Sequence, residues 1–78
     1  MLMNASSSEI HLFIGIKIKQ LRKEKGLTGK ELARCLGVSQ QQVSRYEQGI
    51  NCVHIDLLAK LSEMFKVPIQ TFLPSDDI

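Results

Sequence analysis

Residues 28–47 read TGKELARCLGVSQQQVSRYE, and this segment holds two N-capping signatures that begin eleven residues apart. The first is Thr28-x-x-Glu31 and the second is Ser39-x-x-Gln42. In such a capping box the hydroxyl accepts a hydrogen bond from a backbone N–H in the first turn of a helix, and the carboxylate or amide three residues later accepts one in return. The segment therefore predicts two short helices in close succession.

A tight turn is expected between these two helices. Gly37 stands where a left-handed residue would end the first helix, a conformation that glycine adopts without steric cost. We place the helices at about 29–36 and 40–48. The exposed face of the second would carry side chains whose donors and acceptors suit the edges of bases: Gln40, Gln41, Gln42, Ser44 and Arg45. The leading hypothesis is a helix-turn-helix that reads DNA.

The flanking segments also show the apolar spacing of helices. A first helix from Glu9 to about Lys25 carries an apolar stripe and contains Gly15, which we expect to permit the close approach of another helix. Two more helices are expected at about 54–66 and 68–73. No strand pattern is present. The predicted fold class is thus all-α, a compact bundle of five short helices.

The length of 78 residues predicts one domain. We assign residues 9–74 to this helix-turn-helix domain, residues 1–8 to a disordered N-terminal segment and residues 75–78 to a flexible tail. Leu12 and Ile16 are four residues apart on a face away from the main apolar stripe of the first helix. Together with the last helix, they are candidate surfaces for a dimer.

Charge is divided unevenly along the chain, although the net charge is only +2. Residues 17–45 contain eight basic and two acidic side chains, whereas residues 46–78 contain two basic and five acidic ones. A charged segment alone is more often a solvated face than a binding site. Here the basic segment overlaps the two capped helices, which favours a nucleic-acid-binding face.

Other function classes find little support in the sequence. Cys35 and Cys52 form no Cys-x-x-Cys pair, and the histidines lack zinc-site spacing, so we expect no metal and no cofactor. We expect Cys35 to be a small buried hydrophobe. The chain shows no arrangement of nucleophile and base and no phosphate loop, so we expect neither an enzyme nor a small-molecule substrate. It shows no leader and no apolar run of about 20 residues, which predicts a cytoplasmic protein that does not enter a membrane.

Four motifs carry a family resemblance: IGxxIxxLR (14–22), GLTxxELA (26–33), GVS (37–39) and VSRYExG (43–49). Together they resemble the phage-repressor-type helix-turn-helix proteins, the lambda-repressor-like or Xre family. The resemblance extends from Ile14 to Leu73. Residues 39–47 also resemble short regulators of bacterial fimbrial operons.

The resemblance implies that residues 40–48 form a recognition helix in the major groove. Gln40 and Gln41 match base-contacting positions, and a glutamine amide can pair with adenine N6 and N7. Ser44 and Arg45, one turn further on, are expected to reach a base edge or a phosphate. Gln42 has two interpretations, as a base contact or as the second half of the capping box.

The resemblance also implies phosphate contacts at the start of the 29–36 helix, from Thr28, the Gly29 N–H and Lys30, and at Ser39. Many relatives have glutamine at the position of Gly29, where it braces the first glutamine of the recognition helix. We expect Gln40 to lack this brace.

Arg22 and Glu47 match positions that form a partly buried ion pair in the family. This pair ties the first helix to the end of the recognition helix. Because loss of one partner strands a charge, we assign both residues to the architecture and not to DNA contact.

The sequence thus predicts a sequence-specific regulator of transcription that binds double-stranded DNA and blocks or assists RNA polymerase. A homodimer on two half-sites is expected, because one small domain offers few contacts. The alternative is an antitoxin-like or adaptor module in which the helix-turn-helix is a scaffold for a partner protein.

Overall fold

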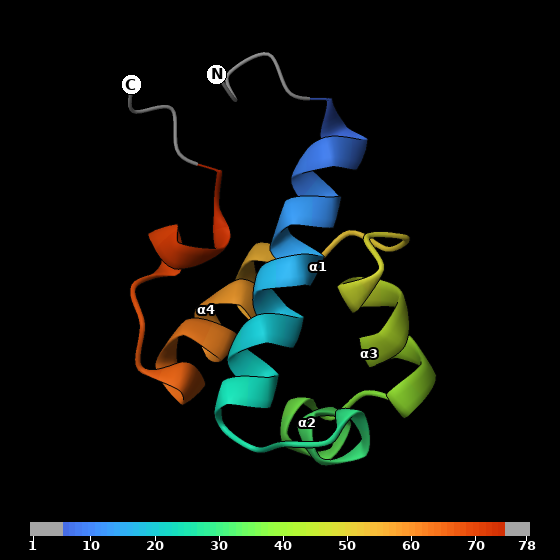
Figure 1. The fold of residues 1–78 in the computed structure, drawn as a ribbon, viewed down its shortest axis with the longest axis vertical. Coiled ribbons are helices and arrows are strands. Elements are labelled where there is room, and N and C mark those ends of the chain that lie inside the picture. The colour runs from blue at the N-terminus through green and yellow to red at the C-terminus, as the bar shows by residue number, and fades with distance from the viewer. Residues whose placement is uncertain (1–5, 75–78) are drawn as a thin grey trace.

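The computed structural model of the chain describes residues 6–74, which form four α-helices and one 3-10 helix. These are α1 (Ser7–Glu24), α2 (Gly29–Leu36), α3 (Gln40–Glu47), α4 (Ile55–Phe65) and η2 (Ile69–Phe72). The long helix α1 runs through the middle, with α2 and α3 on one side and α4 and η2 on the other (Figure 1). The described part of the chain contains no strand, in agreement with the predicted all-α fold.

The prediction of five α-helices was wrong at the last element, because the chain forms four α-helices and then a single 3-10 turn. Only i to i+3 bonds form there: Thr71 N–H donates to the Pro68 carbonyl at 2.9 Å, and Leu73 N–H to the Gln70 carbonyl at 3.1 Å. Pro68 and Pro74 lack backbone N–H groups and enclose only five residues. A segment of this length is better suited to a 3-10 turn than to an α-helix.

The first helix begins earlier than expected. Ser6 caps α1: its hydroxyl accepts from Glu9 N–H at 3.2 Å, while its own N–H donates to the Glu9 carboxylate at 2.8 Å. Residues 6–8, assigned from the sequence to a disordered segment, therefore form the cap and first turn of α1. The expected disorder of residues 1–5 and the expected tail at 75–78 lie outside the described residues.

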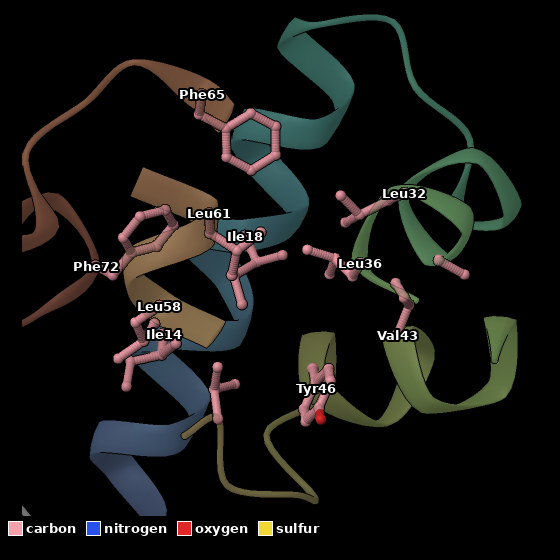
Figure 2. Packing of buried hydrophobic residues seen from close by; sticks show 12 residues of the cluster. Ile14, Ile18, Leu32, Leu36, Val43, Tyr46, Leu58, Leu61, Phe65 and Phe72 are labelled. Atoms are coloured by element: carbon pink, nitrogen blue, oxygen red, sulfur yellow. The ribbon is translucent and has the colours of Figure 1, made fainter. Parts of the chain in front are cut away.

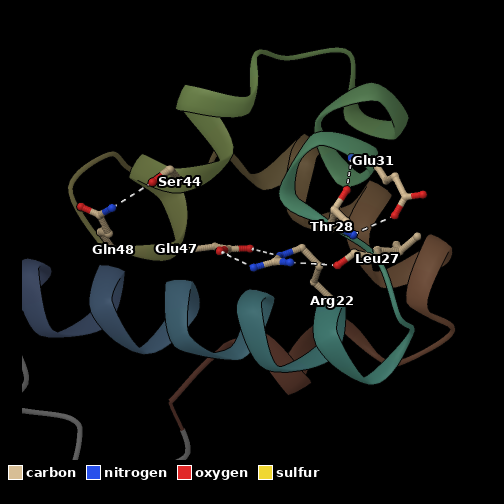
Figure 3. Close-up of polar contacts among 7 residues, drawn as sticks. All are labelled: Arg22, Leu27, Thr28, Glu31, Ser44, Glu47 and Gln48. Carbon is tan, nitrogen blue, oxygen red and sulfur yellow. Dashed lines mark hydrogen bonds and ion pairs between the residues drawn. The ribbon is translucent and has the colours of Figure 1, made fainter.

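The two capping signatures behave differently. The Thr28 box is complete, since Thr28 Oγ1 accepts from Glu31 N–H at 3.0 Å and Glu31 Oε1 accepts from Thr28 N–H at 2.8 Å (Figure 3). At Ser39 only the hydroxyl is used, accepting from Gln42 N–H at 3.0 Å. A neutral amide gains less than a carboxylate from such a bond, which gives a physical reason for the missing half.

One hydrophobic core joins all five elements (Figure 2). Its largest fully buried side chains come from each element in turn: Ile18 of α1, Leu32 of α2, Val43 of α3, Leu61 of α4 and Phe72 of η2. The described residues contain no buried polar or charged side chain. The core therefore packs the inner face of α3 against the rest of the domain.

Helices α1 and α3 meet at two glycines. A Cβ on the buried Gly15 would overlap the Tyr46 carbonyl oxygen and would lie 2.6 Å from that of Glu47. Gly49, which adopts a left-handed conformation with φ of 74°, would place a Cβ 2.8 Å from Leu12 Cα. The expectation that Gly15 permits a close helix approach is confirmed, and it sets the end of α3 directly on the backbone of α1.

Cys35 is exposed, so the prediction that it is buried was wrong. Helix α2 buries Leu32, Ala33 and Leu36, and a residue at position 35 projects more than a quarter turn away from the centre of that arc. Cys52 is also a free, exposed thiol. None of the described helices is long and apolar enough to cross a membrane.

Candidate nucleic-acid interface

Helix α3 has one buried and one open face. Val43 and Tyr46 are buried in the core, whereas Gln40, Gln41 and Arg45 are exposed. Two further polar side chains of the candidate site, Gln42 and Ser44, are half-buried. The side chains expected to read bases therefore gather on the face of α3 that is turned away from the core.

Two stripes of polar residues run along this open face. Gln40 and Ser44 are four residues apart, and so are Gln41 and Arg45, which places each pair on one side of the helix. The N-terminal member of each pair is a glutamine with both donor and acceptor capacity. The open face thus offers two adjacent rows of hydrogen-bonding groups.

An open hollow of about 270 Å³ lies between α1, α2 and α3. Its lining brings together residues from all three helices: Lys19, Arg22, Gly29, Gln40, Val43, Ser44 and Glu47. A Cβ added at Gly29 would lie 3.9 Å from Gln40 Cγ and 4.0 Å from Gln40 Nε2, an ordinary van der Waals distance. Gln40 therefore lies over Gly29, with space for the side chain that this position lacks.

Arg22 and Glu47, which both line the hollow, form a two-pronged ion pair (Figure 3). Arg22 Nε donates to Glu47 Oε2 at 2.6 Å and Nη2 donates to Oε1 at 3.1 Å, while Nη1 donates to the Leu27 carbonyl at 2.8 Å. Their side chains are only 12% and 9% exposed. The hydrogen bond with Glu47 raises the pKa of the Arg22 guanidinium. The pair ties α1 to both the segment before α2 and the end of α3.

The start of α2 presents two backbone donors. The capping box occupies the N–H groups of Thr28 and Glu31. The first backbone hydrogen bond of α2 runs from Leu32 N–H to the Thr28 carbonyl. The N–H groups of Gly29 and Lys30 come before it and have no acceptor in the described structure. Free N–H groups at a helix N-terminus favour an anion such as a phosphate. The structure thus places Thr28, Gly29 and Lys30 at one helix end, beside Gln40.

Two candidate base readers are held by residues that the sequence analysis missed. Gln48 Nε2 donates to Ser44 Oγ at 2.9 Å (Figure 3). Arg45 Nε donates to Asn51 Oδ1 at 3.1 Å. The spacing of four between Ser44 and Gln48 could have predicted the first bond. The second depends on the path of the chain after α3, which no short motif reports.

The Gln42 side chain does not complete the cap, since its amide oxygen accepts no hydrogen bond from the Ser39 backbone N–H. That amide is left free for another partner. Ser39 itself caps α3 through its oxygen and keeps its hydroxyl proton for donation.

Comparison with known proteins places this arrangement in a family. The helix-turn-helix family HTH_3, which comprises lambda-repressor-like (Xre) domains, matches residues 18–72. This match spans more than half of the chain, and the chain belongs to that family.

Individual relatives share the same region. The chain is 38% identical over 64 residues to an HTH-type transcriptional regulator of Rickettsia conorii, covering 82% of this chain and 51% of that one. It is 43% identical over 54 residues to the antitoxin PezA of Streptococcus pneumoniae, covering 69% and 34%. The chain spans between 18% and 51% of the length of the first curated relatives that it matches.

Among solved structures, the DNA-binding domain of BldD superposes with a TM-score of 0.76 at 30% sequence identity. The likeness covers 88% of this chain and all of that domain. The bundle described above is therefore close to that of a complete DNA-binding domain.

Proposed function

We propose that this protein is a sequence-specific regulator of transcription that binds double-stranded DNA through α3. The observation that carries the proposal is that α3 is packed tightly against the rest of the domain. Its inner face is buried and its end lies on the α1 backbone at Gly15 and Gly49, while Gln40 and Gln41 stay exposed. A helix held in this way can enter the major groove without losing its position in the domain.

The comparisons support the same function. The Rickettsia relative is named as an HTH-type transcriptional regulator, and the BldD domain is named as DNA-binding. The basic segment from residue 17 to residue 45 covers the C-terminal part of α1, all of α2 and most of α3. In this proposal Gln40, Gln41, Ser44 and Arg45 face base edges, and Gln42 is an additional candidate because its amide is not used in a cap.

Phosphate contacts would fix the domain on the duplex. We assign them to the N–H groups of Gly29 and Lys30, the Lys30 side chain, and the hydroxyls of Thr28 and Ser39. These groups are near the starts of α2 and α3. Because every duplex offers phosphates, they would add affinity without sequence preference.

Partners and setting follow from this function. A homodimer would bind two half-sites spaced by about 34 Å or a multiple of it. Leu12 and Ile16, which are 46% and 56% exposed, and Leu73 after η2, which is 38% exposed, are the candidate dimer surfaces. The dimer would work in the cytoplasm without a cofactor and would block or assist RNA polymerase at the bound site.

Selection of bound duplexes from a random library tests the function. Enrichment of one motif, with binding that weakens by a log–log salt slope of about −0.9 for each phosphate neutralised, is the expected result. Failure to enrich any motif would contradict sequence-specific binding.

The similarity to the antitoxin PezA favours a second candidate function, a helix-turn-helix module that binds a partner protein. Apolar partner binding should hardly respond to salt, whereas DNA binding should respond steeply. A complex with a protein partner that persists at high salt, in a chain that enriches no DNA motif, would favour this alternative.

A further inference from the structure

The turn after α3 holds the side chain of Arg45. Arg45 stands in the last turn of α3, exposed to solvent, and its Nε donates to Asn51 Oδ1 at 3.1 Å. Asn51 lies six residues further along the chain and outside any helix. A surface arginine is usually free to rotate about several bonds, so a tether at Nε restricts where its terminal nitrogens can point.

The backbone fixes Asn51 in turn. The Arg45 carbonyl accepts from Ile50 N–H at 3.0 Å and from Asn51 N–H at 3.4 Å. Gly49, which stands between the end of α3 and these two residues, is left-handed and lies against the α1 backbone at Leu12. Asn51 is therefore bonded to both the main chain and the side chain of Arg45, in a loop that rests on the longest helix of the domain.

The tether leaves the charge of Arg45 available. Its partner is a neutral amide, whereas the partner of Arg22 is a carboxylate that neutralises it. Within residues 6–74 the only ion pair is that between Arg22 and Glu47. Arg22 thus stabilises the fold, whereas Arg45 keeps its charge and an exposed position.

The hydrogen bond also selects one edge of the guanidinium. An arginine can bind side-on through Nε and one terminal nitrogen, or end-on through both terminal nitrogens. Asn51 occupies Nε, so the end-on edge remains. Two terminal N–H groups match the O6 and N7 acceptors of guanine in the major groove. Arg45 also lies on the same stripe of α3 as Gln41, toward the candidate base-reading face.

We propose that Asn51 is a positioning residue that presents the end-on edge of Arg45 to a guanine, so that the turn after α3 helps to set sequence preference. This inference rests on the proposed DNA-binding function.

The test begins with the wild-type protein and its selected duplex, in which each guanine is replaced in turn by 7-deazaguanine, which lacks the N7 acceptor. Wild type should lose about tenfold in affinity at one guanine. Asn51→Ala should reduce that loss to about threefold or less. Asn51→Asp keeps the acceptor oxygen and should restore that relative loss, while its added negative charge should weaken binding to every duplex. Glu63→Gln, which changes an exposed side chain on α4, is the control and should show the same N7-dependent loss as wild type.

A double-mutant cycle that combines Asn51→Ala with Arg45→Lys tests the proposal even if Asn51→Ala is less stable than wild type. Arg45→Lys abolishes both the tether and the two-pronged edge, so adding Asn51→Ala to it should cause no further change in the 7-deazaguanine effect. If Asn51→Ala still changes the 7-deazaguanine effect in the Arg45→Lys background, the proposal is wrong. An Asn51→Ala variant that keeps the full N7 dependence would also overturn it, as would a wild type insensitive at every guanine, the result expected if Arg45 contacts a phosphate. Failure of wild type to prefer any duplex would instead refute the proposed function itself.

Discussion

Arginine acts in two ways around α3, and the difference lies in its partner. Arg22 makes three hydrogen bonds to Glu47 and Leu27 in a site that is about nine-tenths buried. Arg45 makes one bond, to a neutral amide at the surface. Burial and the partner's charge thus decide which arginine stabilises the fold and which is left to bind a ligand.

Glu47→Gln should destabilise the protein strongly. The amide keeps the size of the side chain but leaves the Arg22 charge, which is only 12% exposed, without its counter-charge, so the free energy of unfolding should fall by about 3 kcal/mol. Urea denaturation measures this change in the free energy of unfolding. Glu63→Gln, which changes an exposed carboxylate on α4, is the control. A loss below about 0.5 kcal/mol, the range of surface changes, would show that the pair contributes little.

Glu31 gives the capping box a pH dependence. The hydrogen bond from the Thr28 N–H lowers the pKa of its carboxyl, with a further contribution from the Thr28 hydroxyl. A carboxyl with a lowered folded pKa stabilises the protein above its unfolded pKa, and this contribution is lost as pH falls through the folded pKa.

The advantage of wild type over Glu31→Gln in urea midpoint should therefore be largest near neutral pH, should shrink as the pH falls below the ordinary pKa of a glutamate, and should disappear only below the lowered pKa of the folded state. Measurements from neutral to acidic pH will show this, with Glu63→Gln as the control for loss of an exposed negative charge. A constant difference across the range would mean that the ionised carboxylate has no role in the cap.

At the scale of elements, the two helical glycines Gly15 and Gly29 differ in what surrounds them. Gly15 faces the carbonyl groups at the end of α3, whereas Gly29 faces open space beside Gln40. Alanine normally favours a helix over glycine by about 1 kcal/mol, so the sign of each substitution depends on these surroundings.

Gly15→Ala should lower the free energy of unfolding by roughly 1–3 kcal/mol, because the added methyl group must push α3 away from α1. It should also weaken DNA binding. Gly29→Ala is the matched variant and should be neutral or stabilising. Thermal and urea unfolding of both variants will decide, and equal stability of the two would contradict the close contact of α1 with α3.

The sequence predicted elements best where side chains act on their own backbone. The Thr28 box and the left-handed Gly37 that ends α2 were found by this local logic. The close approach at Gly15 was predicted from the missing side chain. The local logic was less successful where several partners compete: the amide of Gln42 did not complete its cap, and the segment between Pro68 and Pro74 was too short for an α-helix. Asn51 was missed because its contact with Arg45 depends on the backbone path around Gly49.

At the scale of the whole molecule, the residues that hold α3 in place differ from the polar residues on its exposed face. The core joins all five elements, and the Arg22–Glu47 pair locks α3 to α1. The remaining polar side chains of α3 are then free to face a ligand. If the proposed function holds, such separation would allow the surface of α3 to change sequence preference without a change in fold.

The central claim is that α3 reads base pairs, and comparative selection with two variants tests it most directly. Wild type, Gln40→Ala and Gln41→Ala are each used to select duplexes from the same random library, with Glu63→Gln as the control and thermal unfolding to verify the fold. Each alanine variant should relax the enriched motif at its own base pair, with a loss of discrimination of about 1–3 kcal/mol. If both variants enrich the wild-type motif unchanged, α3 does not read the DNA through these glutamines and the account is wrong.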